Sequence, residues 1–273
     1  MRYPAVSGAF YSSDAKGLQR EVAQYLSDAA LQVVRKERLA IVCPHAGFIY
    51  SGKTAAFSFA ACSNWNKKEI TAVIIGPNHT GMGTPISISA DDWKTPLGIV
   101  KCDTALSEEI VKHSKIAKKD ELAHIREHSV EVQLPFLQVC CPHAKFVAVC
   151  MGVQDAAAAK DLGNAIFEAV KTIKREIVVV ASSDFTHYET ADSAKKKDGA
   201  AIDFLKRMDW ESFEKKVDAE DLSICGHGPI AAAIYYAKRA GAKSCELLKY
   251  TNSGEETGDF EQVVAYAALA VSK

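Results

Sequence analysis

Three features are scarce or missing in this sequence of 273 residues, and each absence excludes a class of protein. The formal net charge is only -1, so no excess of positive charge is present to attract nucleic acid or an acidic membrane surface. No run of about 18 apolar residues occurs, as a membrane-spanning helix would require. Because the amino terminus also lacks the apolar stretch of a secretory signal, we expect a cytoplasmic protein with no nucleic-acid or membrane partner.

The sequence also lacks Cys-x-x-Cys pairs and any sign of a boundary between domains. None of the eight cysteines stands in Cys-x-x-Cys spacing and several lie in apolar runs, which predicts reduced, mostly buried thiols. No fixed-period repeat, low-complexity tract or Pro/Gly/Ser-rich linker divides the chain. We therefore predict a single domain over residues 1–273, long enough to bury a core without disulfides.

Short apolar, β-branched runs alternate with stretches of helical periodicity. The runs are typical of strands buried on both faces and cover residues 39–43, 71–75, 145–150 and 176–181, with two later strands, parallel or antiparallel, at 245–251 and 262–271. Apolar residues at spacings of three and four predict helices at residues 53–62, 104–113, 155–171, 193–208 and 227–240. This order predicts an α/β fold with a largely parallel or mixed central sheet flanked by helices.

Histidines follow three of the predicted strands. His45 follows the strand at residues 39–43, His79 follows the strand at 71–75, and His187 follows the strand at 176–181. In such sheets ligands bind beyond the carboxyl ends of the strands, so we expect these rings to come together. Imidazole is the commonest nitrogen ligand of transition metals, and neighbouring glycines permit tight turns. We predict that His45 and His79 ligate a metal ion.

Cys225 is the predicted third ligand, because it stands beside a glycine at the start of a predicted helix. The helix dipole there would lower the pKa of the thiol and make a thiolate available as a ligand or nucleophile. The alternative is a small buried residue at a helix entrance. Asp184 and His187 are expected to act as acid and base groups in the pocket, although the segment 182–184 also suits a helix cap.

Two motif matches compete with this interpretation. Residues 47–54 fit the phosphate-loop pattern, but the bulky segment 48–50 would fill the space that an anion needs. Residues 124–128 fit the inverted zinc-peptidase pattern of two histidines on one helix face with a glutamate that activates water. Pro135 interrupts the helical pattern of residues 127–139, so this element is either kinked or formed by two helices that meet there.

We instead expect Glu127 and His128 to cap that helix and to lend hydrogen bonds to the pocket. Trp93 stands beside the segment Thr95-Pro96-Leu97-Gly98. Its indole would serve as a wall of the pocket or as a buried loop anchor.

These segments, taken in order, resemble the signatures of the Memo protein family over nearly the whole chain. They are RYPAVSGAFY at 2–11, PHAGFIYSG at 44–52, GPNH at 76–79, TPLG at 95–98, EHS at 127–129, SSDFTHY at 182–188, CG at 225–226 and YTNSG at 250–254. The resemblance implies a fold like the class III extradiol dioxygenases of the LigB type, in which two histidines and a glutamate hold ferrous iron. In the Memo family a cysteine replaces that glutamate, which implies the ligands His45, His79 and Cys225, with Asp184 and His187 lining the pocket.

The exchange of a carboxylate for a softer thiolate favours iron, copper or zinc. We therefore expect a mononuclear iron or copper His/His/Cys site, with zinc also compatible, and redox or dioxygenase-like chemistry of a metal-dependent oxidoreductase on a small molecule or peptide. The family resemblance also implies a radical S-adenosylmethionine protein as a partner. The alternative function is a non-catalytic module that captures a peptide or a small anion in the same pocket.

Overall fold

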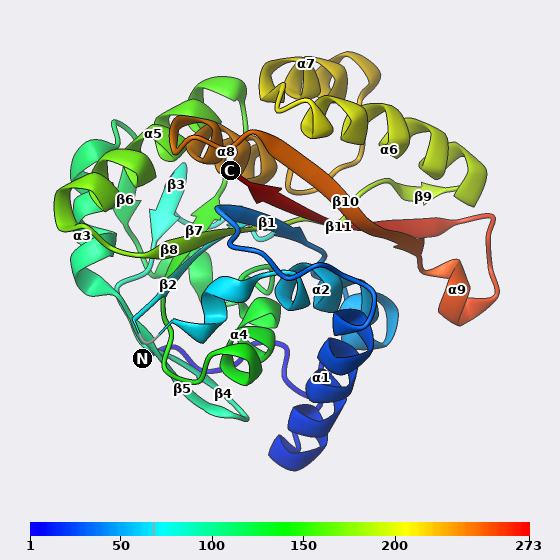
Figure 1. Ribbon diagram of the computed structural model, residues 1–273, viewed down its shortest axis with the longest axis horizontal. Helices are drawn as coiled ribbons and strands as arrows, with labels where there is room; N and C mark the ends of the chain where they lie inside the picture. Colours follow the sequence, from blue (N-terminus) through cyan, green and yellow to red (C-terminus); the bar gives the residue numbers. More distant parts are fainter. Residues whose placement is uncertain (68) are drawn as a thin grey trace.

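A mixed central sheet covered by helices on both faces forms the core of the computed structural model, which describes residues 1–67 and 69–273 (Figure 1). The strands are β1 (Ala40–Cys43), β2 (Thr71–Pro77), β3 (Ile86–Ile88), β4 (Trp93–Thr95), β5 (Gly98–Cys102), β6 (Ala117–Lys119), β7 (Lys145–Met151), β8 (Ile177–Ser182), β9 (His187–Glu189), β10 (Ser244–Asn252) and β11 (Val263–Ser272). Along the main path of the sheet their order is β10-β11-β1-β8-β2-β7-β3-β6.

Four parallel strands form the centre of the sheet, and an antiparallel pair extends it on one side. β1, β8, β2 and β7 run parallel to one another, whereas β11 pairs antiparallel with β1 and with β10. Nearly all residues of the four central strands are buried, which explains why their sequences are almost continuously apolar. The predicted α/β class with a mixed sheet is confirmed, including the two late strands.

Helices cover the two faces of the sheet and enclose two hydrophobic cores (Figure 1). α3 (Thr104–His113), α5 (Ala156–Ile173), α6 (Ala191–Lys206), α7 (Trp210–Glu220) and α8 (His227–Arg239) pack on one core. α1 (Ala15–Ala30), α2 (Phe48–Ala60) and α4 (Leu134–Cys140) pack on the other, and the short α9 (Gly254–Thr257) lies between β10 and β11 in the chain. Within the described ranges, no helix combines the length and the apolar character that crossing a bilayer demands.

Several element boundaries differ from the prediction. α2 begins at Phe48 and not at residue 53, because Phe48 packs between Tyr11 and Phe136 and so extends the helix towards β1. α1 and α7 were not predicted from the sequence, although the side chains of Asp14 and Asp209 cap them.

Residues 127–139 resolve into two short helices. The 3₁₀ turn η3 (Glu131–Gln133) leads into α4, and Pro135 lies in the first turn of α4. The missing N–H of a proline leaves no hydrogen bond unmade at that position. Of the two alternatives for this segment, the meeting of two helices is the one observed.

Candidate metal centre

The candidate site lies beyond the carboxyl ends of the central parallel strands. His45 follows β1 by two residues, His79 follows β2 by two residues, and Asp184 follows β8 by two residues. These side chains border a pocket of about 550 Å³. The other lining residues include His128, His187 and the aromatic side chains of Phe10, Tyr50, Tyr188 and Tyr266. The structure thus brings together the three histidines that follow strands in the sequence.

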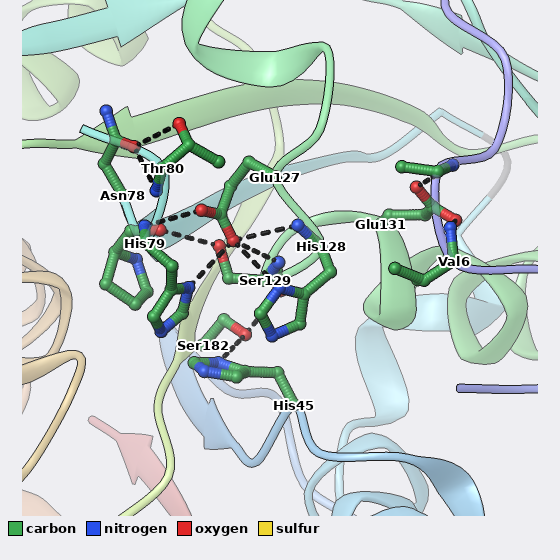
Figure 2. A network of polar contacts seen from close by, with 12 residues as sticks. Val6, His45, Asn78, His79, Thr80, Glu127, His128, Ser129, Glu131 and Ser182 are labelled. Carbon is green, nitrogen blue, oxygen red and sulfur yellow. Dashed lines mark hydrogen bonds and ion pairs between the residues drawn. The ribbon is translucent and has the colours of Figure 1, made fainter. Parts of the chain in front are cut away.

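Three imidazole rings meet at the base of this pocket (Figure 2). The ring centroids of His45 and His79 are 5.2 Å apart, those of His45 and His128 are 5.4 Å apart, and those of His79 and His128 are 4.8 Å apart. One nitrogen from each ring lies within 4.8 Å of the other two, so the trio could hold a metal ion. His128 therefore belongs to the centre itself, beyond the supporting role expected from the sequence.

The buried carboxylate of Glu127 holds two of these histidines, His79 by its ring and backbone and His128 by its backbone. Its Oε2 accepts the His79 amide at 2.6 Å, and its Oε1 accepts from the His79 ring Nδ1 at 2.9 Å and from the amides of His128 and Ser129 at 2.8 and 2.9 Å (Figure 2). Burial raises the pKa of Glu127, but the hydrogen bonds and positive charge of its neighbours outweigh burial and lower it to about 2. Because the carboxylate accepts from Nδ1, Nε2 is the ring nitrogen of His79 that is left for a metal.

A hydroxyl group fixes the tautomer of His45. Ser182 Oγ donates its only proton to the carbonyl of Ser129 at 2.6 Å and accepts from Gln133 Nε2 at 2.9 Å. The His45 Nδ1, 2.9 Å from the same oxygen, must therefore be a donor, which leaves the lone pair on Nε2. Burial, followed by the neighbouring imidazoles, lowers the pKa of His45 well below its ordinary value. The ring is neutral, as metal ligation requires.

Cys225 lies beside His45. Its Sγ is 3.2 Å from the His45 Nε2 and accepts a hydrogen bond from the Asp184 amide at 3.3 Å. Burial, followed by the charge of Asp184, raises the pKa of the Cys225 thiol well above its ordinary value. The expected lowering by the helix dipole is wrong for the metal-free protein, because Cys225 precedes the N-cap Gly226 of α8 and desolvation dominates. A bound cation would act in the opposite direction and favour the thiolate.

Asp184 and His187 complete the wall of the pocket. Asp184 Oδ1 accepts the His45 amide at 2.7 Å, and burial raises the pKa of Asp184 to about 6 although this bond opposes the rise. His187 Nδ1 lies 2.8 Å from the carbonyl of Ser223, and its amide donates to the Ser223 hydroxyl at 2.8 Å. The carbonyl can only accept, so the Nδ1 of His187 carries a proton and Nε2 is the ring nitrogen not held by Ser223.

Trp93 is a buried loop anchor and does not line the pocket. Its side chain is fully buried on β4, where the guanidinium of Arg2 lies 4.2 Å from the ring centroid and Ser89 accepts the indole N–H at 3.1 Å. His124 packs edge-on against the same indole, at 5.5 Å between ring centroids. His124 and His128 therefore share no helix face, and the peptidase pattern has no structural counterpart.

Residues 47–54 form the start of a helix and no phosphate loop. Gly47 is the N-cap of α2, so the amides that a phosphate loop would offer belong to helical turns. The Lys53 ammonium pairs with Glu256 at 2.5 Å, and the Thr54 hydroxyl lies 2.6 Å from the hydroxyl of Thr251. The lysine and the threonine of the phosphate-loop pattern therefore make their contacts outside the candidate site.

An N-terminal strap, residues 2–11, supports the histidines and was missed as a functional element. The ring of Phe10 packs against His128, with 4.7 Å between centroids. The buried carboxylate of Glu131 holds the strap in place through the amides of Ala5 and Val6, the hydroxyl of Tyr11 and an ion pair with Arg2. Arg2 also donates to the carbonyls of His124 and Glu127. Only the family signature at residues 2–11 singled out this segment in the sequence.

Comparison with known proteins gives one consistent family. The family model described as "Memo-like protein" matches residues 2–270. A MEMO1 family protein of Methanosarcina mazei is 42% identical over 272 residues, covering 99% of each chain. A MEMO1 family protein of Methanocaldococcus jannaschii is 40% identical over 283 residues, again covering 99% of each. The crystal structure of an uncharacterized protein of Escherichia coli K12 is similar with a TM-score of 0.45 and 11% identity, covering 84% of this chain and 98% of that one.

Proposed function

We propose that this chain, which belongs to the Memo family, binds one transition-metal ion and uses it in redox or dioxygenase-like chemistry. The observation that supports the proposal is the convergence of three imidazole rings beside the sulfur of Cys225. Glu127 and Ser182 bind the Nδ1 atoms of His79 and His45, so the Nε2 atom of each ring is the one left for a metal. Such an arrangement is typical of a metal centre and unusual in an ordinary polar pocket.

The proposed ligands are His45, His79 and Cys225, with His128 as a further one. The ligand atoms that lie within 4.8 Å of one another belong to His45, His79 and His128, and Cys225 adjoins this group through its Sγ, 3.2 Å from the His45 Nε2. Two imidazoles with a soft thiolate suit iron, copper or zinc, and we favour iron or copper. When bound, the metal supplies Lewis acidity and, if it is redox-active, a route for electrons. A cytoplasmic location and a radical S-adenosylmethionine partner stay predictions from the sequence.

The remaining residues of the pocket would bind and orient a substrate. His187 presents its Nε2 to the pocket and would take up or release a proton there. Asp184 holds the His45 backbone and, with a pKa of about 6, would itself exchange a proton close to neutral pH. Phe10 and Tyr266 offer apolar surface that would exclude water from the bound substrate.

Metal analysis of anaerobically purified protein tests the proposal. The wild type, reconstituted separately with Fe²⁺, Cu⁺ and Zn²⁺, should retain about one equivalent of at least one of them after desalting. The triple variant H45A/H79A/C225A should retain none, because two proposed nitrogen ligands and the sulfur are gone. H143A, which removes an exposed imidazole two residues before β7, is the matched control and should bind as the wild type does. Full metal retention by the triple variant would refute the assignment.

The alternative, a non-catalytic binding module, is favoured by one observation. Tyr50 and Tyr188 line the pocket and are 42% and 74% exposed, as suits capture of a peptide. None of the described residues that line the pocket is lysine or arginine, which disfavours a small anion as the ligand. Peptide binding with equal affinity in metal-free and metal-loaded protein would support the module.

A further inference from the structure

Cys225 lies on a segment with no regular secondary structure, residues 221–226 between α7 and α8, which we name the cysteine loop. The loop packs tightly against the end of β8, where the Gly226 amide donates to Ser183 Oγ at 3.0 Å. A Cβ atom at Gly226 would lie 2.5 Å from the carbonyl oxygen of Ser182, so only glycine fits there. The backbone beside the sulfur is therefore held at close range on the β8 side.

A second anchor comes from the loop between β7 and α5. Gln154 Nε2 donates to the carbonyl of Cys225 at 2.9 Å, and Gln154 Oε1 accepts the amide of Gly228 at 3.1 Å. One side-chain amide thus spans the turn into α8 and satisfies a backbone acceptor and a backbone donor three residues apart. A Cβ atom at Gly228 would lie 2.8 Å from the Gln154 Cβ, so the glycine at this position leaves room for the Gln154 side chain.

We infer that Gln154 is a positioning residue that sets the direction of the Cys225 sulfur toward the metal. The Cys225 carbonyl and the Gly226 amide belong to one peptide group, so the bonds to Gln154 and Ser183 hold the two edges of the peptide plane that follows the Cys225 Cα. The sulfur then has its observed place, 3.2 Å from the His45 Nε2. The inference rests on the proposed function, because it assigns Gln154 a role toward the metal that His45 and Cys225 share.

Two variants of near-equal size test this role. Gln154→Met removes both hydrogen bonds, and Gln154→Glu keeps the acceptor for Gly228 but places a negative charge against the carbonyl of Cys225. Gln24→Met, on the exposed face of α1, is the matched control. Each protein is titrated with Co²⁺, whose absorption separates a sulfur-to-cobalt charge-transfer band from the ligand-field bands to which imidazoles also contribute.

Both Gln154 variants should bind Co²⁺ roughly 10-fold to 100-fold more weakly and lose charge-transfer intensity, while the ligand-field bands persist at saturation. Q24M should match the wild type. A role confined to stability would lower the melting temperature and leave the charge-transfer band intact. A full-strength band with affinity within about twofold of the wild type in both variants would overturn the inference. If Q154M does not fold, Q154E decides the question, since it keeps the size and one of the two bonds.

A second readout does not depend on metal at all. In metal-free protein, iodoacetamide should alkylate Cys225 faster in Q154M and Q154E than in the wild type, because the loop holds the thiol less firmly; peptide mass spectrometry identifies the site. If the wild type fails to bind any metal, the proposed function fails. The alkylation rate still shows whether Gln154 positions the thiol, and equal rates in all variants would contradict that claim.

Discussion

The two sides of the pocket are held in different ways. On the histidine side, made of His45, His79 and His128, buried side-chain oxygens accept from the ring Nδ1 of His45, from the ring Nδ1 of His79 and from the backbone amide of His128. The cysteine side, made of Asp184, His187 and Cys225, rests mainly on backbone groups, such as the Asp184 amide and the Ser223 carbonyl. The comparison indicates that protein groups alone orient the rings of His45 and His79, whereas the position of the sulfur depends on how well one loop is anchored.

The two buried carboxylates of the site, Glu127 and Asp184, differ in the number of hydrogen bonds that they accept and in their pKa values. Glu127 accepts four hydrogen bonds from His79, His128 and Ser129, and its pKa is lowered to about 2 despite burial. Asp184 has fewer donors, and burial raises its pKa to about 6. The histidine side therefore carries a permanent negative charge, and the cysteine side carries a group that can take up a proton.

The largest effect is expected from breaking the buried ion pair behind the histidine side. Arg2→Met leaves the Glu131 carboxylate, which is completely buried, without its cationic partner. Removing one member of such a pair typically costs about 3 kcal/mol of unfolding free energy or more. Urea denaturation of metal-free protein measures the loss. Lys101→Met removes an exposed partner of Asp92 and should cost less than about 1 kcal/mol, so equal losses in the two variants would contradict the role of the strap.

A smaller effect is expected from Glu127→Gln, which tests whether the histidine side owes its order to the carboxylate. The glutamine can offer only one acceptor oxygen, so the amide or the ring Nδ1 of His79 must face an NH₂ group. The affinity for Zn²⁺ should fall roughly 10-fold to 100-fold, measured by competition with a chelator. Glu121→Gln, which alters a carboxylate bonded to Ser89 and Ala90 outside the pocket, is the control. If E127Q binds Zn²⁺ as tightly as the wild type, the carboxylate does not order the histidines for metal binding.

The last expected effect is the pH dependence of stability, in which the two sides should oppose each other. Glu127, lowered from 4.5 to about 2, stabilises the fold above pH 4.5, and this contribution is lost as the pH falls toward 2. Asp184, raised from 3.8 to about 6, binds its proton more tightly in the folded state, so its contribution declines as the pH rises from about 4 to about 6.

Between pH 4.5 and 6, the unfolding free energy of the metal-free wild type should fall with pH, with a slope that corresponds to up to about one bound proton. Asp184→Asn should remove the part of this slope that Asp184 causes, as measured by urea denaturation. The matched variant Asp198→Asn should remove a similar slope, because burial raises the pKa of Asp198 to about 6 as well. Stability curves of D184N and the wild type that run parallel through this range would show that Asp184 does not titrate there.

The sequence predicted the central sheet and the histidine positions well, because both depend on local pattern. Strands buried on both faces are recognisable as apolar runs, and a histidine that follows such a run is carried to the same edge of the sheet as the others. The three-residue strands β3, β4, β6 and β9 were missed, since segments of that length show no periodicity.

Contacts between distant segments could not be predicted. Nothing local to Glu131 indicates that it binds Arg2, more than a hundred residues away, or that Phe10 packs on His128. His128 looked like a capping residue because it precedes a helical pattern, and only the folded loop turns its ring to the other two. The role of Trp93 as an anchor depends in the same way on Arg2.

The pocket draws its walls from segments far apart in the sequence, from Ala9 in the strap to Tyr266 on β11. β11 is also the antiparallel neighbour of β1, the strand that leads to His45. The cavity therefore has all of its walls only when the strap and β11 have both packed onto the central sheet. A partly folded chain without β11 in place would present an open, hydrated cavity, so closure of the sheet decides when the pocket becomes enclosed.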